Sequence, residues 1–190
     1  MKIAITGGIG SGKSFVCERL RKFGIVVYDC DEAAKRLMRT SVDIQKRLSD
    51  LIGTQVFADG KLQKAVLATF LLQSKHNAQA INDIVHPAVA TDFERSGYDY
   101  MECAILFDSG FIDRVYIDKV VCVTAPLAER VQRIVQRDHI TPAKAQEWID
   151  RPVPQDAGSE RRHYEIVNDG KCDVDAQIQE IIEEISETNK

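Results

Sequence analysis

The chain has 190 residues, 44% of them hydrophobic, and a formal net charge of −4, which suits one domain with an inserted lobe. This acidic balance argues against a broad nucleic-acid or membrane surface. No apolar run is long enough to span a bilayer and no signal-peptide pattern opens the chain, so we expect a cytoplasmic protein. Five cysteines without a C-x-x-C pair indicate free thiols in a reducing compartment.

An apolar run at residues 2–6 predicts a buried strand, and residues 7–14 directly after it read GGIGSGKS. This is the pattern of a phosphate-binding P-loop, in which glycines let successive backbone N–H groups point at a phosphate. Lys13 then reaches the β- and γ-phosphates of a nucleotide, and Ser14 offers a hydroxyl to Mg²⁺. A helix predicted after the loop adds its positive dipole end. The expected nucleotide-binding residues are Gly8, Ile9, Gly10, Ser11, Gly12, Lys13, Ser14 and Phe15.

The second predicted strand, residues 25–28, ends in Asp29-Cys30-Asp31. In open α/β sheets, ligands bind beyond the carboxyl ends of the strands. Phosphoryl transfer needs a group that orients the attacking hydroxyl and accepts its proton, and it needs Mg²⁺ ligands; either aspartate can serve. Both can also be the N-cap and first-turn acids of a helix predicted at residues 32–38, and the two interpretations are compatible.

The long stretch from residue 29 to residue 101 is almost wholly helical in its pattern. Such an insertion is where a small kinase would place an acceptor-binding lobe. Because proline is comfortable at the first helical position, His86-Pro87 predicts a helix start, with His86 as a cap or a substrate contact. Besides residues 32–38, the predicted helices are 42–52, 61–72 and 87–95, with a turn at 58–60.

A third strand is predicted at residues 102–107, ending in Asp108. An apolar strand that ends in an acid resembles a Walker B strand, whose carboxylate holds Mg²⁺ through water, although many strands stop at an aspartate turn. A fourth strand at 119–124 precedes a helix at 126–138. On that helix Arg133 and Arg137 share a face, where they can bind phosphates, stack on adenine or simply be solvated.

The charged segment 137–162, with a short helix near 142–149, predicts a lid. The last strand, residues 164–167, leads into the tight turn Asn168-Asp169-Gly170, and an amphipathic helix follows. The alternation of strands and helices predicts an α/β fold with a five-stranded parallel sheet and helices on both faces.

In their order along nearly the whole chain, these motifs resemble the dephospho-CoA kinase family of small-molecule P-loop kinases. The resemblance implies Mg²⁺- and ATP-dependent phosphorylation of the ribose 3′-hydroxyl of dephospho-CoA, the last step of coenzyme A synthesis. It implies Asp31, Lys13 and Arg137 as catalytic residues, with Asp31 the base, and Ser14 and Asp31 as metal ligands. The other residues that it implies are Asp29, Lys35, His86, Asp108 and Arg151 for the substrate, and Arg133, Asn168 and Gly170 for ATP.

The resemblance also implies the fold of the single domain, a three-layer P-loop kinase sandwich with a helical substrate lobe and a lid. Its core would lie at about 1–30, 100–136 and 163–190, the CoA lobe at about 31–99, and the lid at about 137–162. A monomer with at most weak self-association is expected, without nucleic-acid or membrane partners. The chain departs from the family pattern at Ala104 and Asp108, where the family usually has proline and glutamate.

Two other functions fit parts of the sequence. A shikimate-kinase-like enzyme also places Asp-x-Asp after its second strand, but its glycine-triplet substrate motif is missing here. A nucleotide-dependent switch or binding protein would usually carry the guanine-reading N-K-x-D motif, which this chain lacks. A test of acceptors separates the three functions.

Overall fold

A five-stranded, all-parallel sheet forms the centre of the computed structural model, which describes residues 1–150 and 161–188. The strand order is β2-β5-β1-β6-β7, so β1 lies in the middle with the glycine loop at its carboxyl end. The parallel five-stranded sheet predicted from the alternating pattern is therefore confirmed. The strands are β1 (Ile3–Thr6), β2 (Val27–Asp29), β5 (Tyr100–Glu102), β6 (Lys119–Thr124) and β7 (Tyr164–Val167).

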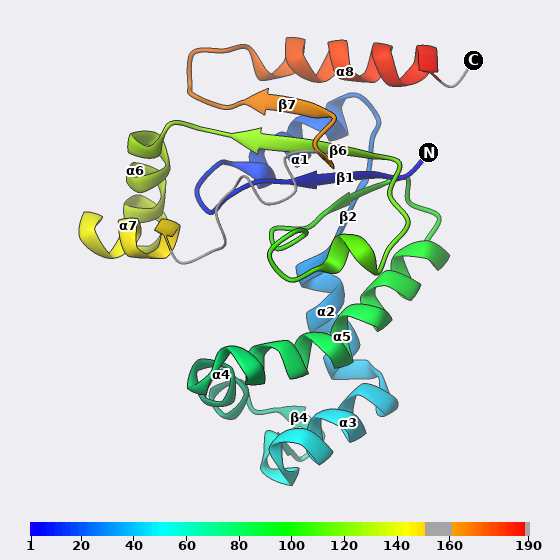
Figure 1. Cartoon of the computed structure of the whole chain (residues 1–190), viewed down its shortest axis with the longest axis vertical. Helices are drawn as coiled ribbons and strands as arrows, with labels where there is room; N and C mark the ends of the chain where they lie inside the picture. Colours follow the sequence, from blue (N-terminus) through cyan, green and yellow to red (C-terminus); the bar gives the residue numbers. More distant parts are fainter. Residues whose placement is uncertain (151–160, 189–190) are drawn as a thin grey trace.

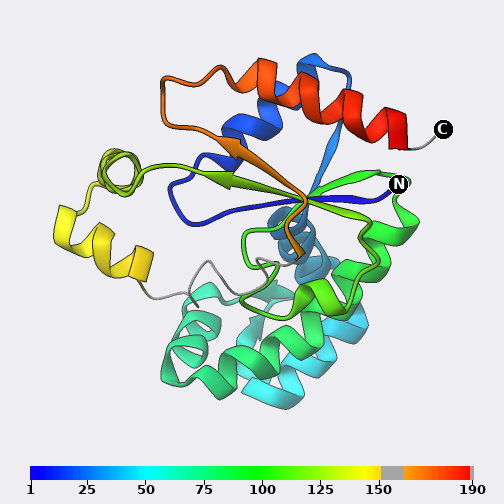
Figure 2. The same ribbon diagram turned by 45° about the horizontal axis from the view of Figure 1, so that its top comes forward.

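Helices cover both faces of the sheet, as Figures 1 and 2 show. Side chains alternate along a strand, so Ile3 and Ile5 pack on one face against α1 (Lys13–Lys22) and α8 (Val174–Thr188). Ala4 faces the opposite way, into a second apolar cluster with α2 (Cys30–Thr40) and α5 (Lys75–Arg95). The two clusters make the three-layer core that carries the loop.

The insertion between β2 and β5 extends away from the sheet (Figure 1). A hairpin interrupts the predicted helix at 61–72: its turn is Asp59-Gly60, both at positive φ, and the helix begins only at Lys64. Positive φ at two successive residues favours a tight hairpin. The insertion comprises α2, α3 (Val42–Ile52), a short helical turn (Thr54–Val56), β3 (Phe57–Ala58), β4 (Lys61–Leu62), α4 (Lys64–Gln73) and α5.

The helix start predicted at Pro87 is wrong, because α5 begins at Lys75 and passes through the proline. The Ser74 hydroxyl caps this helix by accepting the Asn77 N–H at 3.0 Å. A proline inside a helix leaves the carbonyl four residues earlier without its N–H partner. Here that carbonyl belongs to Asp83, and Nη2 of Arg47 lies 3.5 Å from it. The helix tolerates Pro87, and His86 is consequently an interior residue rather than a cap.

The prediction of a strand at residues 102–107 is also wrong after its first residue, because β5 ends at Glu102. Past this point the neighbouring strands end as well: β1 turns into the glycine loop after Thr6, and β2 turns into α2 after Asp29. With no strand left to pair with, the apolar run folds as a compact loop, in which Leu106 is fully buried. Asp108 therefore lies in a loop, not at a strand end.

Two further helices, α6 (Leu127–Asp138) and α7 (Pro142–Asp150), follow β6 beyond the end of the sheet (Figure 1). Both agree with the helices predicted there. All five cysteines lie in the described part of the chain and are free thiols. In that part, no helix has the length and apolar character needed to cross a membrane.

Candidate active site

The glycine loop has a backbone that strongly favours glycine. Gly10 and Gly12 adopt φ of 78° and 93°, a region that costs other residues about 1–2 kcal/mol. Space is lacking too: a Cβ on Gly7 would lie 2.3 Å from the Val123 carbonyl oxygen, and one on Gly12 would lie 2.1 Å from Nδ2 of Asn168. The motif glycines therefore set both the curvature of the loop and its close packing on β6 and on the turn after β7.

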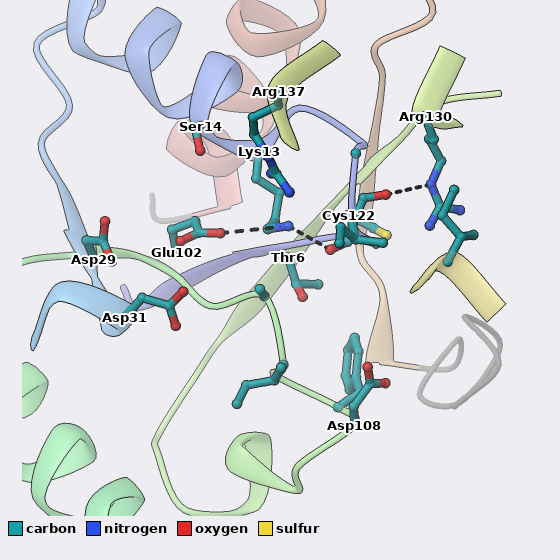
Figure 3. A pocket seen from close by; sticks show the side chains of 18 of the residues that line it. Thr6, Lys13, Ser14, Asp29, Asp31, Glu102, Asp108, Cys122, Arg130 and Arg137 are labelled. Carbon is teal, nitrogen blue, oxygen red and sulfur yellow. Dashed lines mark hydrogen bonds and ion pairs between the residues drawn. The ribbon is translucent and has the colours of Figure 1, made fainter. Parts of the chain in front are cut away.

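Lys13, whose side chain is only 11% exposed, lies at the start of α1 and bends back over the loop. Its Nζ donates a hydrogen bond to the Gly7 carbonyl at 2.9 Å and lies 4.0 Å from Oε1 of Glu102 (Figure 3). Burial lowers the pKa of the Lys13 ammonium, while the negative charges of Glu102 and Asp31 oppose the shift. The loop thus already holds a desolvated cation at the position where its motif predicts one.

Glu102, the last residue of β5, is a functional candidate that the sequence reasoning missed. It pairs in register with Asp29 of β2 and faces Lys13. Burial raises the pKa of its carboxyl to about 7; Lys13 opposes the shift, and Asp29 and Asp31 add to it. The only signal in the sequence was an acid at the start of the apolar run, where the strand in fact ends.

A cavity of about 710 Å³ opens above the carboxyl ends of β2, β5, β1 and β6. It brings together ten of the residues predicted for the site. Its wall also contains Glu102, Arg130 and Arg162, which had not been predicted. The ten predicted residues are Gly8, Ile9, Gly10, Lys13, Ser14, Asp29, Asp31, Lys35, Asp108 and Arg137.

The two aspartates after β2 have different local roles. Oδ1 of Asp29 accepts the Glu32 N–H at 2.9 Å and caps α2, so the capping interpretation holds for this residue. Asp31, in the first turn of the helix, points into the cavity toward Lys13 and Glu102 (Figure 3). Lys35 lines the same wall and pairs with Glu32 at 2.7 Å.

Arginines of α6 brace the glycine loop. Nε of Arg130, which is only 9% exposed, donates to the Ile9 carbonyl at 2.9 Å. Arg133 donates to the Ser11 carbonyl at 3.2 Å and to the Asn168 carbonyl at 2.9 Å. Nδ2 of Asn168 also donates to the Ser11 carbonyl at 2.9 Å. Arg133 and Asn168 thus hold the outside of the loop and do not line the cavity.

The remaining predicted residues lie elsewhere. Arg137 lines the cavity and pairs with Asp138 at 2.7 Å. His86 is not among the residues that line the cavity: its buried ring packs edge-on against Phe111 at 5.2 Å, and burial lowers its pKa to about 4. Burial also raises the pKa of the Asp108 carboxyl in the cavity wall. Ser11, Gly12, Phe15 and Gly170 are likewise outside the cavity lining, and Arg151 lies outside the described residues.

The parallel sheet, the glycine loop between β1 and α1, and the acids at the ends of the adjacent strands together define a P-loop kinase. A family model described as dephospho-CoA kinase matches residues 1–173. The chain belongs to the dephospho-CoA kinase family, and it is an enzyme with that family's ATP-dependent kinase activity.

Curated relatives carry the same description. A dephospho-CoA kinase of Bacteroides fragilis is 42% identical over 190 residues, covering 96% of this chain and 91% of the relative. One from Corynebacterium diphtheriae is 33% identical over 186 residues, covering 90% of each chain. The chain therefore spans nearly the full length of both relatives.

Solved structures share the fold. The crystal structure of TT1252 from Thermus thermophilus is 26% identical, with a TM-score of 0.76 and coverage of 98% of this chain and 97% of that chain. A dephospho-CoA kinase from Campylobacter jejuni, 18% identical over the whole of both chains, has a TM-score of 0.66. A shikimate kinase from Acinetobacter baumannii, 16% identical, covers 100% of this chain and 94% of that chain with a TM-score of 0.57, so the fold alone does not separate the two acceptors.

Proposed function

We propose that the chain transfers the γ-phosphoryl group of ATP to the ribose 3′-hydroxyl of dephospho-CoA, giving coenzyme A and ADP. The observation that carries this proposal is a single cavity lined by Lys13 on the donor side and by Asp31 on the acceptor side. Catalysis of phosphoryl transfer is mostly positioning and charge stabilisation, and the cavity supplies both.

The donor side fits a triphosphate. The loop between β1 and α1 has no room for side chains at Gly7, Gly10 and Gly12, so its backbone and the positive dipole end of α1 can approach a phosphate closely. Lys13 is already desolvated, and in the described part of the chain it contacts the Gly7 carbonyl and Glu102. Binding of ATP exchanges these partners for phosphate oxygens, which carry more charge.

The acceptor side offers a base. Asp31 points into the cavity from the first turn of α2, while Asp29 uses its carboxylate to cap that helix. We assign to Asp31 the orientation of the attacking hydroxyl and the uptake of its proton. Asp29, Lys35 and Asp108 line the wall around it and are assigned to acceptor binding.

Mg²⁺ fits the oxygen donors of this cavity. Among the described residues, no group of three or more His, Cys, Asp or Glu side chains is arranged to hold a metal ion. Such a cavity suits Mg²⁺, which usually binds through one or two protein oxygens together with substrate phosphates. Ser14 and Asp31 are the residues that would hold it, and when bound it would neutralise charge on the phosphates.

The proposal divides the molecule into a core (1–30, 100–136 and 163–190), an acceptor lobe (31–99) and a lid (137–162). Arg133, Asn168 and Gly170 are assigned to the ATP side. His86 would reach the acceptor only if α5 moved, because its ring is packed in the core.

The decisive test offers several acceptors to the purified protein. Incubation with Mg-ATP and dephospho-CoA, shikimate or a nucleoside, each alone, is followed by ADP release and by mass analysis of the acceptor. We expect ADP release only with dephospho-CoA, with one phosphate gained at the ribose 3′ position. Stimulation by shikimate alone, or by no acceptor, would overturn the proposal.

A further inference from the structure

Five cationic side chains line the cavity, and one of them differs from the rest. Lys13 donates to Gly7, Lys35 to Glu32, Arg130 to Ile9, and Arg137 to Asp138. The fifth is Arg162. Its Nε is buried and has no hydrogen-bond partner among the described residues. A buried guanidinium N–H without an acceptor is costly, and it indicates a site that a ligand oxygen completes.

The backbone at Arg162 is held by the next residue of the chain, His163. His163 donates its N–H to the Val120 carbonyl at 3.0 Å, and its Nδ1 accepts the Val120 N–H at 3.1 Å. These contacts tie Arg162 to the start of β6, so its side chain is presented from a defined position. The preceding residue, Arg161, pairs with Asp113 at 2.6 Å, but both side chains are exposed and the pair contributes little to that position.

The position of Arg162 relative to Lys13 follows from the sheet order. Lys13 lies toward Glu102 of β5, on one side of β1. Arg162 lies just before β7, which pairs with β6, and it lines the cavity together with Cys122 of β6, on the other side of β1. The two cations therefore flank the end of β1, from which the phosphate loop starts.

We propose that Arg162 is a catalytic residue that donates hydrogen bonds to the transferred phosphoryl group from the side opposite Lys13. The bond from phosphorus to the bridging oxygen of ADP breaks, and a bond to the acceptor oxygen forms. The acceptor proton goes to Asp31, while Arg162 stays protonated throughout and stabilises charge on the equatorial oxygens. This inference rests on the proposed function and names a further residue of the same site.

The test compares Arg162→Met with Arg161→Met. Arg161 is adjacent and exposed, does not line the cavity and pairs with Asp113, so it serves as the matched control. At saturating ATP and acceptor, we expect kcat to fall about 100-fold in R162M and to change less than about twofold in R161M. The KM for ATP should change far less than kcat in R162M. Guanidinium ion should restore part of the rate of Arg162→Gly.

Several results would overturn the inference. A near-normal kcat in R162M removes Arg162 from the chemistry. Equal losses in R162M and R161M, without rescue by guanidinium, show a structural anchor, and a rise only in the KM for dephospho-CoA shows acceptor binding. Failure of the wild-type protein to use dephospho-CoA would instead refute the proposed acceptor. The Arg162 comparison is then made on the ADP release from Mg-ATP alone, with the same expected pattern.

Discussion

Replacing Gly12 by alanine tests whether the glycine loop and the turn after β7 form one packed unit. Alanine at φ 93° costs about 1–2 kcal/mol in backbone strain. The new Cβ would lie 2.1 Å from Nδ2 of Asn168, which must move and lose its hydrogen bond to the Ser11 carbonyl. A lost buried hydrogen bond adds about 1–2 kcal/mol. We therefore expect Gly12→Ala to lower the free energy of unfolding by about 2–4 kcal/mol.

Gly170→Ala is the matched control for this prediction. Gly170 also has positive φ, 79°, but a Cβ there would meet nothing within 4 Å. Its replacement should cost only the backbone strain, about 1–2 kcal/mol. Urea unfolding of both variants, and of Gly12→Ala in an Asn168→Ala background, measures the difference. The reasoning is refuted if the two glycine variants lose equal stability, or if removing the Asn168 side chain leaves the Gly12→Ala cost unchanged.

Three further predictions concern the charged residues of the cavity. Asp31→Asn should lower kcat by about 100-fold or more, while the affinity for ATP stays within a few-fold of the wild-type value. Asp43→Asn, at an exposed position, is the control. A near-normal kcat of Asp31→Asn in a steady-state assay would remove Asp31 from the base role. Lys13→Ala should weaken ATP binding in calorimetry and also slow turnover, and unchanged affinity would contradict the partner exchange proposed for this lysine. The carboxyl of Glu102 has a folded pKa raised from 4.5 to about 7, so its contribution to stability is present below pH 4.5 and is lost as the pH rises to 7. Through this group, the free energy of unfolding should fall by about 3 kcal/mol between pH 4.5 and pH 7. Urea unfolding at several pH values should show this fall in the wild-type protein and not in Glu102→Gln. Parallel pH profiles for the two proteins would contradict the prediction.

The phosphate loop could be predicted from sequence because its determinants are local. Each motif glycine is required by its own dihedral angles or by a close approach of the backbone, and Lys13 and Ser14 follow at fixed offsets. Asp31 was also predictable, because a strand followed by a helix places the first-turn residues at the carboxyl edge of the sheet. For these residues, neighbours in sequence are sufficient to define the site.

Glu102 and Pro87 show where local patterns fail. The end of β5 depends on where its neighbours β1 and β2 end. The apolar run from Cys103 to Phe107 gives no indication of where those two strands end. Pro87 has the signature of a helix start, but the carbonyl that it leaves unpaired lies near Arg47, a residue of another helix. The position of Arg162 likewise depends on the contact between Val120 of β6 and His163, the residue just before β7. Each of these features depends on residues distant in sequence.

The strand order itself explains why an acid with a pKa near neutrality lies at the centre of the site. Because β5 lies between β1 and β2, the donor loop and Asp31 are separated by two strand spacings, about 10 Å. In the proposed reaction, the phosphoryl group and the acceptor hydroxyl meet above the end of β5, where the largely buried side chain of Glu102 lies 4.0 Å from Lys13. We expect a bound triphosphate to add negative charge beside Glu102, which would favour the protonated form of its carboxyl and free Lys13 for the phosphates. In this proposal, the strand order that joins the donor and acceptor sites also couples ATP binding to the protonation of Glu102.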